Sequence, residues 1–285
     1  MFITILKTSR IQQWSKNFLL FVPLVLSHSF NTFFLSKMVY AFFSFSFLAS
    51  AIYILNDLFD KKSDQLHPVK KKRPIANNDI STKYAIALLI VYFSISICLS
   101  LQFSLNFKLC LAIYIILNIL YSIGMKRIAI VDLLILATFY TIRIITGGSA
   151  INIKITFWLM TFSVFWFLSL SIIKKLVDIE QTGNASSYDN NSQDFLAQIG
   201  ISSGFASIIV ACLYINNPQV SHLYHTPQLL WVCLIVLLFW FLHIWHSFSL
   251  KKINKDPVIF VLKDKTSLIA LIILGIFGLL SVYTY

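Results

Sequence analysis

Four oxygen-bearing side chains follow closely on one another directly after a long apolar run. They are Asn56, Asp57, Asp60 and Asp64. If one helix continues through them, their spacing puts all four on one face. Carboxylates gathered in this way repel one another unless a cation lies among them. Mg²⁺ is the usual ion, because it accepts one or two carboxylates and leaves its other positions to water and substrate phosphate. The spacing therefore predicts a Mg²⁺ site.

A run of four basic residues follows this acidic group and consists of Lys70, Lys71, Lys72 and Arg73. Its charges are within reach of an anion bound at the same metal. Acidic group and basic run together predict a site for a diphosphate. The alternative is a solvated loop with the lysine excess that is usual on the cytoplasmic side of membrane proteins, which explains the lysines but not the acids.

The elements that must position these residues are membrane-spanning helices. Of the 285 residues, 58% are hydrophobic and 12% are charged, and the mean hydropathy is +0.80. A span needs about 20 mostly apolar residues. The sequence predicts an all-α polytopic membrane protein, one domain over residues 1–285, with about nine spans near 18–35, 38–56, 84–101, 107–123, 130–149, 155–173, 199–215, 228–247 and 267–285.

The charged residues follow this topology. Although the net charge is +12, the basic residues are not arranged to follow a nucleic acid, so no nucleic-acid partner is expected. With the N-terminus in the cytoplasm, the outer connections hold only Lys37, Lys108 and Lys154, and all eleven acidic residues lie on the cytoplasmic side. We expect an integral protein of a bacterial inner membrane with its chemistry at the cytoplasmic mouth, in loops at about 57–83, 123–130, 174–198 and 248–266.

Polar residues near or inside other spans have two interpretations each. Lys16 and Asn17 precede the first span, either as interfacial anchors or as phosphate ligands at the mouth of the bundle. Arg143 lies inside an apolar run, where an unpaired charge is costly. It marks either a structural ion pair or the path of the substrate.

A second cluster follows the sixth span. Lys174 and Asp178 are four residues apart, so a helix would place them on one face, and Lys175 lies beside them. The loop continues through Tyr188 and Asp189 and is the expected second half of the site. The loop that begins at Asp256 and Pro257 predicts an ordered, partly buried element, either a cap over the site or surface packing. The four cysteines and six histidines lack metal-type spacing.

These motifs together resemble the UbiA superfamily of intramembrane prenyltransferases, and most closely its decaprenyl-phosphate phosphoribosyltransferase branch. The resemblance rests on segments spread over the chain. They are Gln13 to Asn17, Asn56 to Asp64, His67 to Ala76, Tyr121 to Lys126, Arg143, the lysine pair at 174–175, and the Asp-Pro segment at 256–264.

The resemblance implies roles for individual residues. Asn56, Asp57, Asp60 and Asp64 would hold Mg²⁺ and a diphosphate, with cations and one tyrosine around the phosphates: Lys16, Lys70, Arg73, Tyr121, Lys126 and Lys174. After the sixth span the branch implies a Lys-Arg-Arg-x-Glu pattern, from which this chain departs with Lys174-Lys175-Leu-Val-Asp178. Aromatic prenyltransferases of the superfamily have a second acidic cluster there, whereas this chain has lysines, which bind an anionic phosphate directly.

The implied reaction is transfer of 5-phosphoribose from phosphoribosyl diphosphate to a polyprenyl phosphate, for cell-envelope glycan synthesis. One alternative is transfer of a prenyl group from a prenyl diphosphate to an aromatic or other acceptor. Another is transport of an anionic solute, although transporters need polar access from both faces and the outer connections here are short and free of acids. Assembly into a homo-oligomer is compatible with either enzyme.

Overall fold

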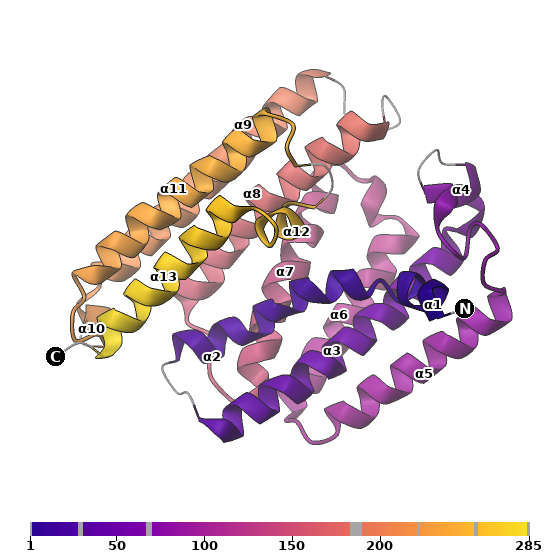
Figure 1. Ribbon diagram of the computed structural model, residues 1–285, viewed down its shortest axis with the longest axis horizontal. Helices are drawn as coiled ribbons and strands as arrows, with labels where there is room; N and C mark the ends of the chain where they lie inside the picture. Colours follow the sequence, from indigo (N-terminus) through magenta and orange to yellow (C-terminus); the bar gives the residue numbers. More distant parts are fainter. Residues whose placement is uncertain are drawn as a thin grey trace. The chain divides into compact units, whose positions relative to one another are not determined.

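This computed structural model describes residues 2–27, 31–66, 70–182, 190–221, 223–253 and 256–283. Within them the chain forms helices joined by turns and loops. Eight of these helices are long and apolar enough to cross a membrane (Figure 1). They are α3 (Thr32–Phe59), α5 (Thr82–Ser100), α6 (Leu105–Ile123), α7 (Val131–Ala150), α8 (Phe157–Thr182), α9 (Asn190–Ile215), α11 (Leu229–Ser249) and α13 (Lys265–Tyr283). The predicted all-α membrane fold is confirmed.

The segment predicted as the first span is built differently from the other spans. After α1 (Phe2–Thr8) come η1 (Ile11–Phe21), a 3₁₀ helix, and α2 (Val22–Leu26). Pro23 lies at the start of α2, and the side chain of Asn31 accepts a hydrogen bond from the backbone N–H of Phe34 at 2.7 Å, which makes α3 begin at Thr32. A single helix over 18–35 is therefore wrong in its bounds. The η1–α2 segment and the eight longer helices are consistent with about nine spans.

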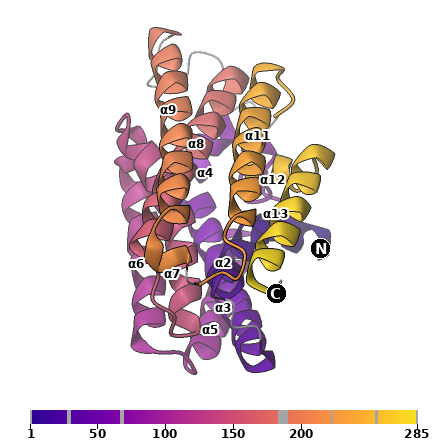
Figure 2. The same cartoon turned by 90° about the vertical axis from the view of Figure 1, so that its left-hand side faces the viewer.

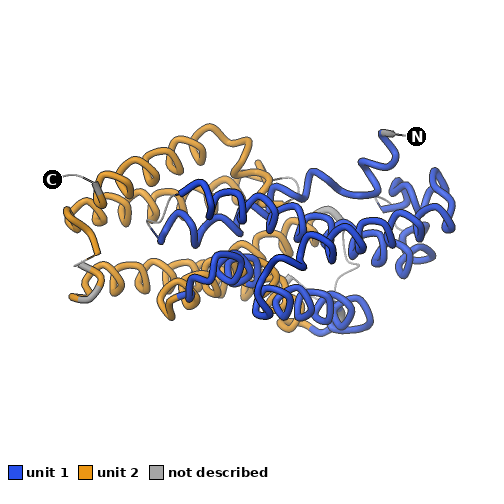
Figure 3. Tube along the Cα trace, turned by 90° about the horizontal axis from the view of Figure 1, so that it is seen from below, with its two compact units in different colours: residues 1–128, 142–155 blue, residues 129–141, 156–285 orange. Residues whose placement is uncertain are grey.

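The chain divides into two compact units (Figure 3). Unit 1 comprises residues 1–128 and 142–155, and unit 2 comprises residues 129–141 and 156–285. One domain over residues 1–285 stays a prediction. The shorter elements are α4 (Lys61–Leu66), η2 (Lys70–Lys72) and η3 (Met125–Arg127) in unit 1, and α10 (Pro218–Ser221) and α12 (Pro257–Val261) in unit 2.

Helix α3 carries much of the packing of unit 1 and lies alongside α5 (Figure 1). Its buried face includes the small residues Ser44, Ser46 and Ser50. Ser44 donates a hydrogen bond to the backbone carbonyl of Ser96 on α5 at 3.0 Å. Small residues allow membrane helices to approach closely, and their hydroxyls find partners across the interface.

The 3₁₀ helix η1 packs against α3 through residues spaced by three. In a 3₁₀ helix such residues lie above one another on one face. Trp14 donates from Nε1 to the hydroxyl of Ser50 at 2.9 Å, and Asn17 donates from Nδ2 to the hydroxyl of Ser46 at 2.9 Å. Leu20 lies on the same face and is fully buried. Sequence spacing thus fixes how the N-terminal segment lies on α3.

Close helix packing in unit 2 depends on two glycines. Figure 2 shows α8 beside α9 and α11 beside α13. Gly200 and Gly204 of α9 are four residues apart and face aromatic rings of α11. An added Cβ would lie 2.6 Å from the ring of Trp245 or 1.9 Å from the ring of Phe241. Glycine at both positions therefore lets α9 approach α11.

Two aspartates cap helices α12 and α13. Asp256 accepts from the backbone N–H of Val258 at 3.0 Å and starts α12, in which Pro257 and Val261 are buried. The predicted ordered, partly buried element is thereby confirmed. Asp264 accepts from the backbone N–H of Ser267 at 2.7 Å and lies 2.8 Å from His243 Nε2. Burial raises the pKa of the Asp264 carboxyl, but hydrogen bonds from Ser267 and His243 outweigh burial and lower it.

Candidate functional site

The predicted acidic group spans the end of one helix and the start of another. Helix α3 ends at Phe59, and Asp60 has φ −85° and ψ 2°, in the bridge region of backbone space. The backbone still turns helically here, since the Asp64 N–H donates to the Asp60 carbonyl at 2.8 Å. Asn56 and Asp57 belong to α3, whereas Asp64 belongs to α4. The prediction that all four share one face of a continuous helix is therefore wrong, because the chain changes direction at Asp60.

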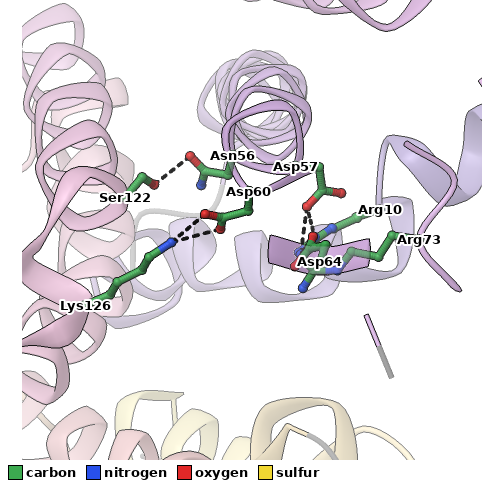
Figure 4. A network of polar contacts seen from close by, with 8 residues as sticks. All are labelled: Arg10, Asn56, Asp57, Asp60, Asp64, Arg73, Ser122 and Lys126. Atoms are coloured by element: carbon green, nitrogen blue, oxygen red, sulfur yellow. Dashed lines mark hydrogen bonds and ion pairs between the residues drawn. The ribbon is translucent and has the colours of Figure 1, made fainter. Parts of the chain in front are cut away.

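Asp57 and Asp64 form one half of the polar network in Figure 4. The Nη1 atom of Arg73 donates to Asp57 Oδ1 at 3.0 Å and to Asp64 Oδ2 at 2.6 Å. Arg10 donates to the same oxygen of Asp57. The two carboxylates are only 4% and 3% exposed, whereas the two arginines are 25% and 28% exposed. Two nearly buried negative charges are thus neutralised by two cations that still reach the surface.

Asn56 and Asp60 form the other half. Ser122 of α6 donates to Asn56 Oδ1 at 2.8 Å. The Nζ atom of Lys126, in η3, donates to both oxygens of Asp60 at 2.7 and 2.9 Å. Figure 4 shows Asp60 directed toward Lys126 and Asp57 toward the arginines. The acidic group is thereby divided into two parts, each with its own cations.

The donors suit a divalent cation in their chemistry, although they do not form one cluster. In the part of the chain that the structure describes, no three acidic, histidine or cysteine side chains are grouped as metal ligands. Arg73 Nη1, however, stands between oxygens of Asp57 and Asp64, and Lys126 Nζ stands between the two oxygens of Asp60. Each nitrogen marks a point where carboxylate oxygens converge on positive charge. One or two carboxylates at such a point suffice for Mg²⁺ when a phosphate supplies further ligands.

The basic run is divided between two environments. Arg73 contacts the acidic group, whereas Lys71 and Lys72 line a separate cavity of about 400 Å³ with Gln65, Ala76 and Asn77. Lys70 is exposed. His67 and Pro68, which belong to the same predicted motif, lie outside the described residues. Within the run, Arg73 thus forms ion pairs with Asp57 and Asp64.

Asn17 and Arg143 lie together in the interior of unit 1. Arg143 is 3% exposed, and its Nε donates to Asn17 Oδ1 at 2.9 Å. Its guanidinium carbon lies 5.2 Å from the ring centre of Phe45 and 5.3 Å from that of Tyr114, and Nη2 donates to the Tyr114 hydroxyl at 3.3 Å. These contacts join η1, α3, α6 and α7. A role for Asn17 or Arg143 in substrate binding stays a prediction.

Two further predicted phosphate ligands are partly or fully enclosed in unit 1. Lys16 of η1 is 7% exposed, and Tyr121 of α6 is half-buried. Both make polar or ring contacts within the protein. Their assignment to substrate binding also stays a prediction.

The two lysines of α8 differ within unit 2. Lys175 Nζ lies 2.6 Å from Oδ2 of Asp132, a carboxylate that is 2% exposed. Lys174 is half-buried and has no hydrogen bond or ion pair to any described residue. Lys174 and Asp178 lie four residues apart on α8, so the prediction that they share one helix face is confirmed, and the Asp178 side chain is exposed. Tyr188 and Asp189 lie outside the described residues.

Sequence reasoning missed two partners of the acidic group. Arg10 contacts Asp57 from 47 residues away, and Ser122 contacts Asn56 from 66 residues away. No local spacing rule connects residues so distant. The available signal was weak in both cases: Arg10 begins the polar segment before the first span, and Ser122 follows Tyr121 in a motif already singled out.

Comparison with known sequences assigns most of the chain to one family. The UbiA prenyltransferase family matches residues 18–269. An uncharacterized protein of Sinorhizobium fredii is 33% identical over 90% of this chain, and the chain spans about half of that protein's length (52%). A nodulation protein of Azorhizobium caulinodans is 28% identical over 77% of this chain and 74% of that protein. A decaprenyl-phosphate phosphoribosyltransferase of Mycobacterium tuberculosis is 30% identical over 64% of this chain and 63% of that enzyme.

Comparison with solved structures agrees on the fold. The structure of a UbiA homolog from Archaeoglobus fulgidus bound to GPP and Mg²⁺ superimposes with a TM-score of 0.69 and covers 98% of this chain and 99% of that one. Sequence identity in this match is 14%, so the likeness concerns the fold alone.

Proposed function

The chain belongs to the UbiA prenyltransferase family, and from this premise we propose that it transfers 5-phosphoribose from phosphoribosyl diphosphate to a polyprenyl phosphate. The product is a polyprenylphosphoryl-5-phosphoribose for cell-envelope glycan synthesis. Relatives named decaprenyl-phosphate phosphoribosyltransferase support this choice within the family. We place the protein in a bacterial inner membrane with its N-terminus in the cytoplasm, because this orientation puts 19 of the 23 lysines and arginines on the cytoplasmic side.

The acidic group is the proposed donor half-site. Asn56 and Asp60 in one part of the acidic group and Asp64 in the other would hold Mg²⁺, and Asp57 shares the Arg73 contact with Asp64. When bound, the metal neutralises the charge that develops on the departing diphosphate. Arg73 and Lys126 already lie at the carboxylates, so they need to move only locally to meet phosphate oxygens. Lys16 and Lys70 supply further charge for the phosphate on C5.

The environment of Lys174 is the observation that favours transfer of phosphoribose over transfer of a prenyl group. A half-buried ammonium with no hydrogen bond or ion pair to a described residue is suited to an anionic ligand. The resemblance to the superfamily implies an acidic cluster at this place after the sixth span in aromatic prenyltransferases. Lys174 would therefore bind the phosphate of the lipid acceptor, while Lys175, fixed by Asp132, supports it.

The reaction needs no general base from the protein. A phosphate monoester carries about −1.5 to −2 charge near neutral pH, so a lipid phosphate oxygen is already nucleophilic. This oxygen forms a bond to C1 of the ribose while the bond from C1 to the diphosphate breaks, with inversion at C1. The protein contributes by positioning both anions and by neutralising charge as it shifts to the diphosphate.

Prenyl transfer to an aromatic or other acceptor is the second candidate function. The match to the UbiA prenyltransferase family favours it, because prenyl transfer is the activity in that family's description. The two functions differ in the donor, so a donor test separates them.

The experiment offers both donors to membranes that contain the protein. Phosphoribosyl diphosphate labelled with ³²P at the 5-phosphate is incubated with polyprenyl phosphate and Mg²⁺, and a prenyl diphosphate is supplied in a parallel reaction. We expect a labelled lipid whose mass equals that of polyprenyl phosphate plus phosphoribose. Consumption of the prenyl diphosphate, with no label in lipid, would replace the proposal by the second candidate function.

A further inference from the structure

In unit 1, cationic side chains occupy the points at the carboxylates where the proposed function needs a metal ion. Arg73 Nη1 lies 3.0 Å from Asp57 Oδ1 and 2.6 Å from Asp64 Oδ2, so two oxygens from α3 and α4 converge on one nitrogen (Figure 4). A divalent cation binds carboxylate oxygens at about 2.0–2.6 Å. The nitrogen and a metal ion therefore cannot occupy this position together.

The same arrangement recurs at the other half of the acidic group. Lys126 Nζ lies within 2.9 Å of both oxygens of Asp60, which is the place a metal bound by that carboxylate would take. Arg10 adds a second guanidinium at Asp57. Cations of the protein thus cover both halves of the donor site.

Burial explains why the ligand-free protein needs these cations. The Asp57 and Asp64 carboxylates are almost inaccessible to water, and without a counter-ion each would be a nearly buried, uncompensated charge that also repels the other. Arg73 and Arg10 are each about a quarter exposed, so solvent can receive their guanidinium groups when they leave.

We propose that Arg73, with Lys126 at the other half, is an internal counter-ion that a divalent cation replaces, and that the released guanidinium then binds the donor's diphosphate. This inference rests on the proposed function and describes how the donor half-site is regulated. Metal binding without diphosphate is weakened, because it must break the Arg73 ion pairs. When diphosphate is present, the displaced arginine gains a new anionic partner, so metal and diphosphate strengthen each other's binding.

The test measures Mn²⁺ binding to the purified protein in detergent, by the electron paramagnetic resonance signal of the free ion. Arg73→Gln is compared with wild type and with Lys72→Gln. The control removes the same charge from the neighbouring position, where the side chain lines a cavity whose lining residues include none of these carboxylates. Without diphosphate, we expect Arg73→Gln to bind Mn²⁺ at least about tenfold more tightly than wild type, the size of one lost charge-assisted contact. Lys72→Gln should differ from wild type by less than about threefold.

The second arm repeats the titration with inorganic diphosphate. Chelation of Mn²⁺ in solution is the same for all variants, so differences among variants report on the protein. Wild type and Lys72→Gln should gain more Mn²⁺ affinity from diphosphate than Arg73→Gln does. Arg73→Lys should fall between wild type and Arg73→Gln, and a folded Arg73→Lys protein guards against a glutamine variant that fails to fold.

Two outcomes would contradict the proposed replacement of Arg73 by a divalent cation. Equal effects of Arg73→Gln and Lys72→Gln would mean that only net charge matters, and weaker Mn²⁺ binding in Arg73→Gln would mean that the arginine supports the metal site. Neither titration contains ribose or lipid. A protein that exchanges Arg73 for Mn²⁺ but transfers no phosphoribose would therefore refute the proposed reaction and leave the exchange standing.

Discussion

Two arginines of unit 1 are held in opposite ways. Arg73 is 28% exposed and bonded to two carboxylates, whereas Arg143 is 3% exposed and surrounded by an amide, a phenol and two aromatic rings. The partners of Arg73 are anions that another cation can also bind. The hydrogen-bonding partners of Arg143 in this network are neutral groups of the protein itself. We infer that Arg73 belongs to an exchangeable ligand site and Arg143 to the fixed structure, and the following predictions test this contrast.

The largest effect is expected at Asp60, on the exchangeable side. Asp60→Asn should reduce turnover on the order of 10³-fold, the usual loss when a charge-stabilising group is removed from an active site. Its melting temperature should stay close to that of wild type, because the Asp60 carboxylate is 33% exposed and its Lys126 partner 29%. The measurements are initial rates with phosphoribosyl diphosphate and thermal unfolding in detergent. Near-normal Mg²⁺-dependent turnover would remove Asp60 from the site.

Arg143→Ala should show the opposite pattern. It leaves Asn17 and Tyr114 without a charged donor and opens a cavity between two rings, so we expect a loss of about 3 kcal/mol in unfolding free energy. Arg143→Lys keeps the charge but not the fork of donors, and it should lose less. Thermal or denaturant unfolding measures both. If Arg143→Ala has normal stability but a large rise in the KM of a substrate, Arg143 belongs to the ligand site and not to the fixed structure.

The lysine pair of α8 repeats the contrast in unit 2. Lys174→Ala should raise the KM for polyprenyl phosphate by about tenfold to a hundredfold, the cost of one charge-assisted contact, with little change in stability. Lys175→Ala should lower stability by about 1–2 kcal/mol, because it leaves the nearly buried Asp132 carboxylate with less compensation. Each substrate is varied in turn. If Lys174→Ala raises only the KM for the sugar diphosphate, the assignment of donor and acceptor to the two half-sites must be exchanged.

The smallest effect is expected at Asp264, which caps α13 and belongs to neither the ligand site nor the network around Arg143. Because the pKa of Asp264 is lowered in the folded state, its stabilising contribution is present above the unfolded pKa of about 4 and is lost as pH falls through the folded value. Asp264→Asn should cost about 0.5 kcal/mol at neutral pH, because asparagine keeps the cap but loses the charge near the N-terminus of α13. The difference in melting temperature between the variant and wild type should shrink below about pH 4. A difference that is independent of pH would assign the effect to packing.

The sequence was sufficient for the fold class because hydropathy reports directly on membrane helices, and eight predicted spans correspond to helices of similar bounds. It failed at 18–35, where Pro23 and the Asn31 cap divide an apolar run that looks continuous. Spacing rules brought Asn56, Asp57, Asp60 and Asp64 together. They could not foresee the turn at Asp60 or the contacts from Arg10 and Ser122, because such contacts are set by tertiary packing.

The central claim is that the carboxylates at the end of α3 bind a ligand rather than hold the fold. It is tested most directly by melting curves of purified wild type and Asp60→Asn, each with and without Mg²⁺ and phosphoribosyl diphosphate. Ligand at about a hundred times its Kd adds about 2.7 kcal/mol to the stability of the state that binds it. We expect equal melting temperatures without ligand and a rise of several degrees with ligand in wild type alone. A large loss in ligand-free Asp60→Asn, or the same rise in both proteins, would contradict it.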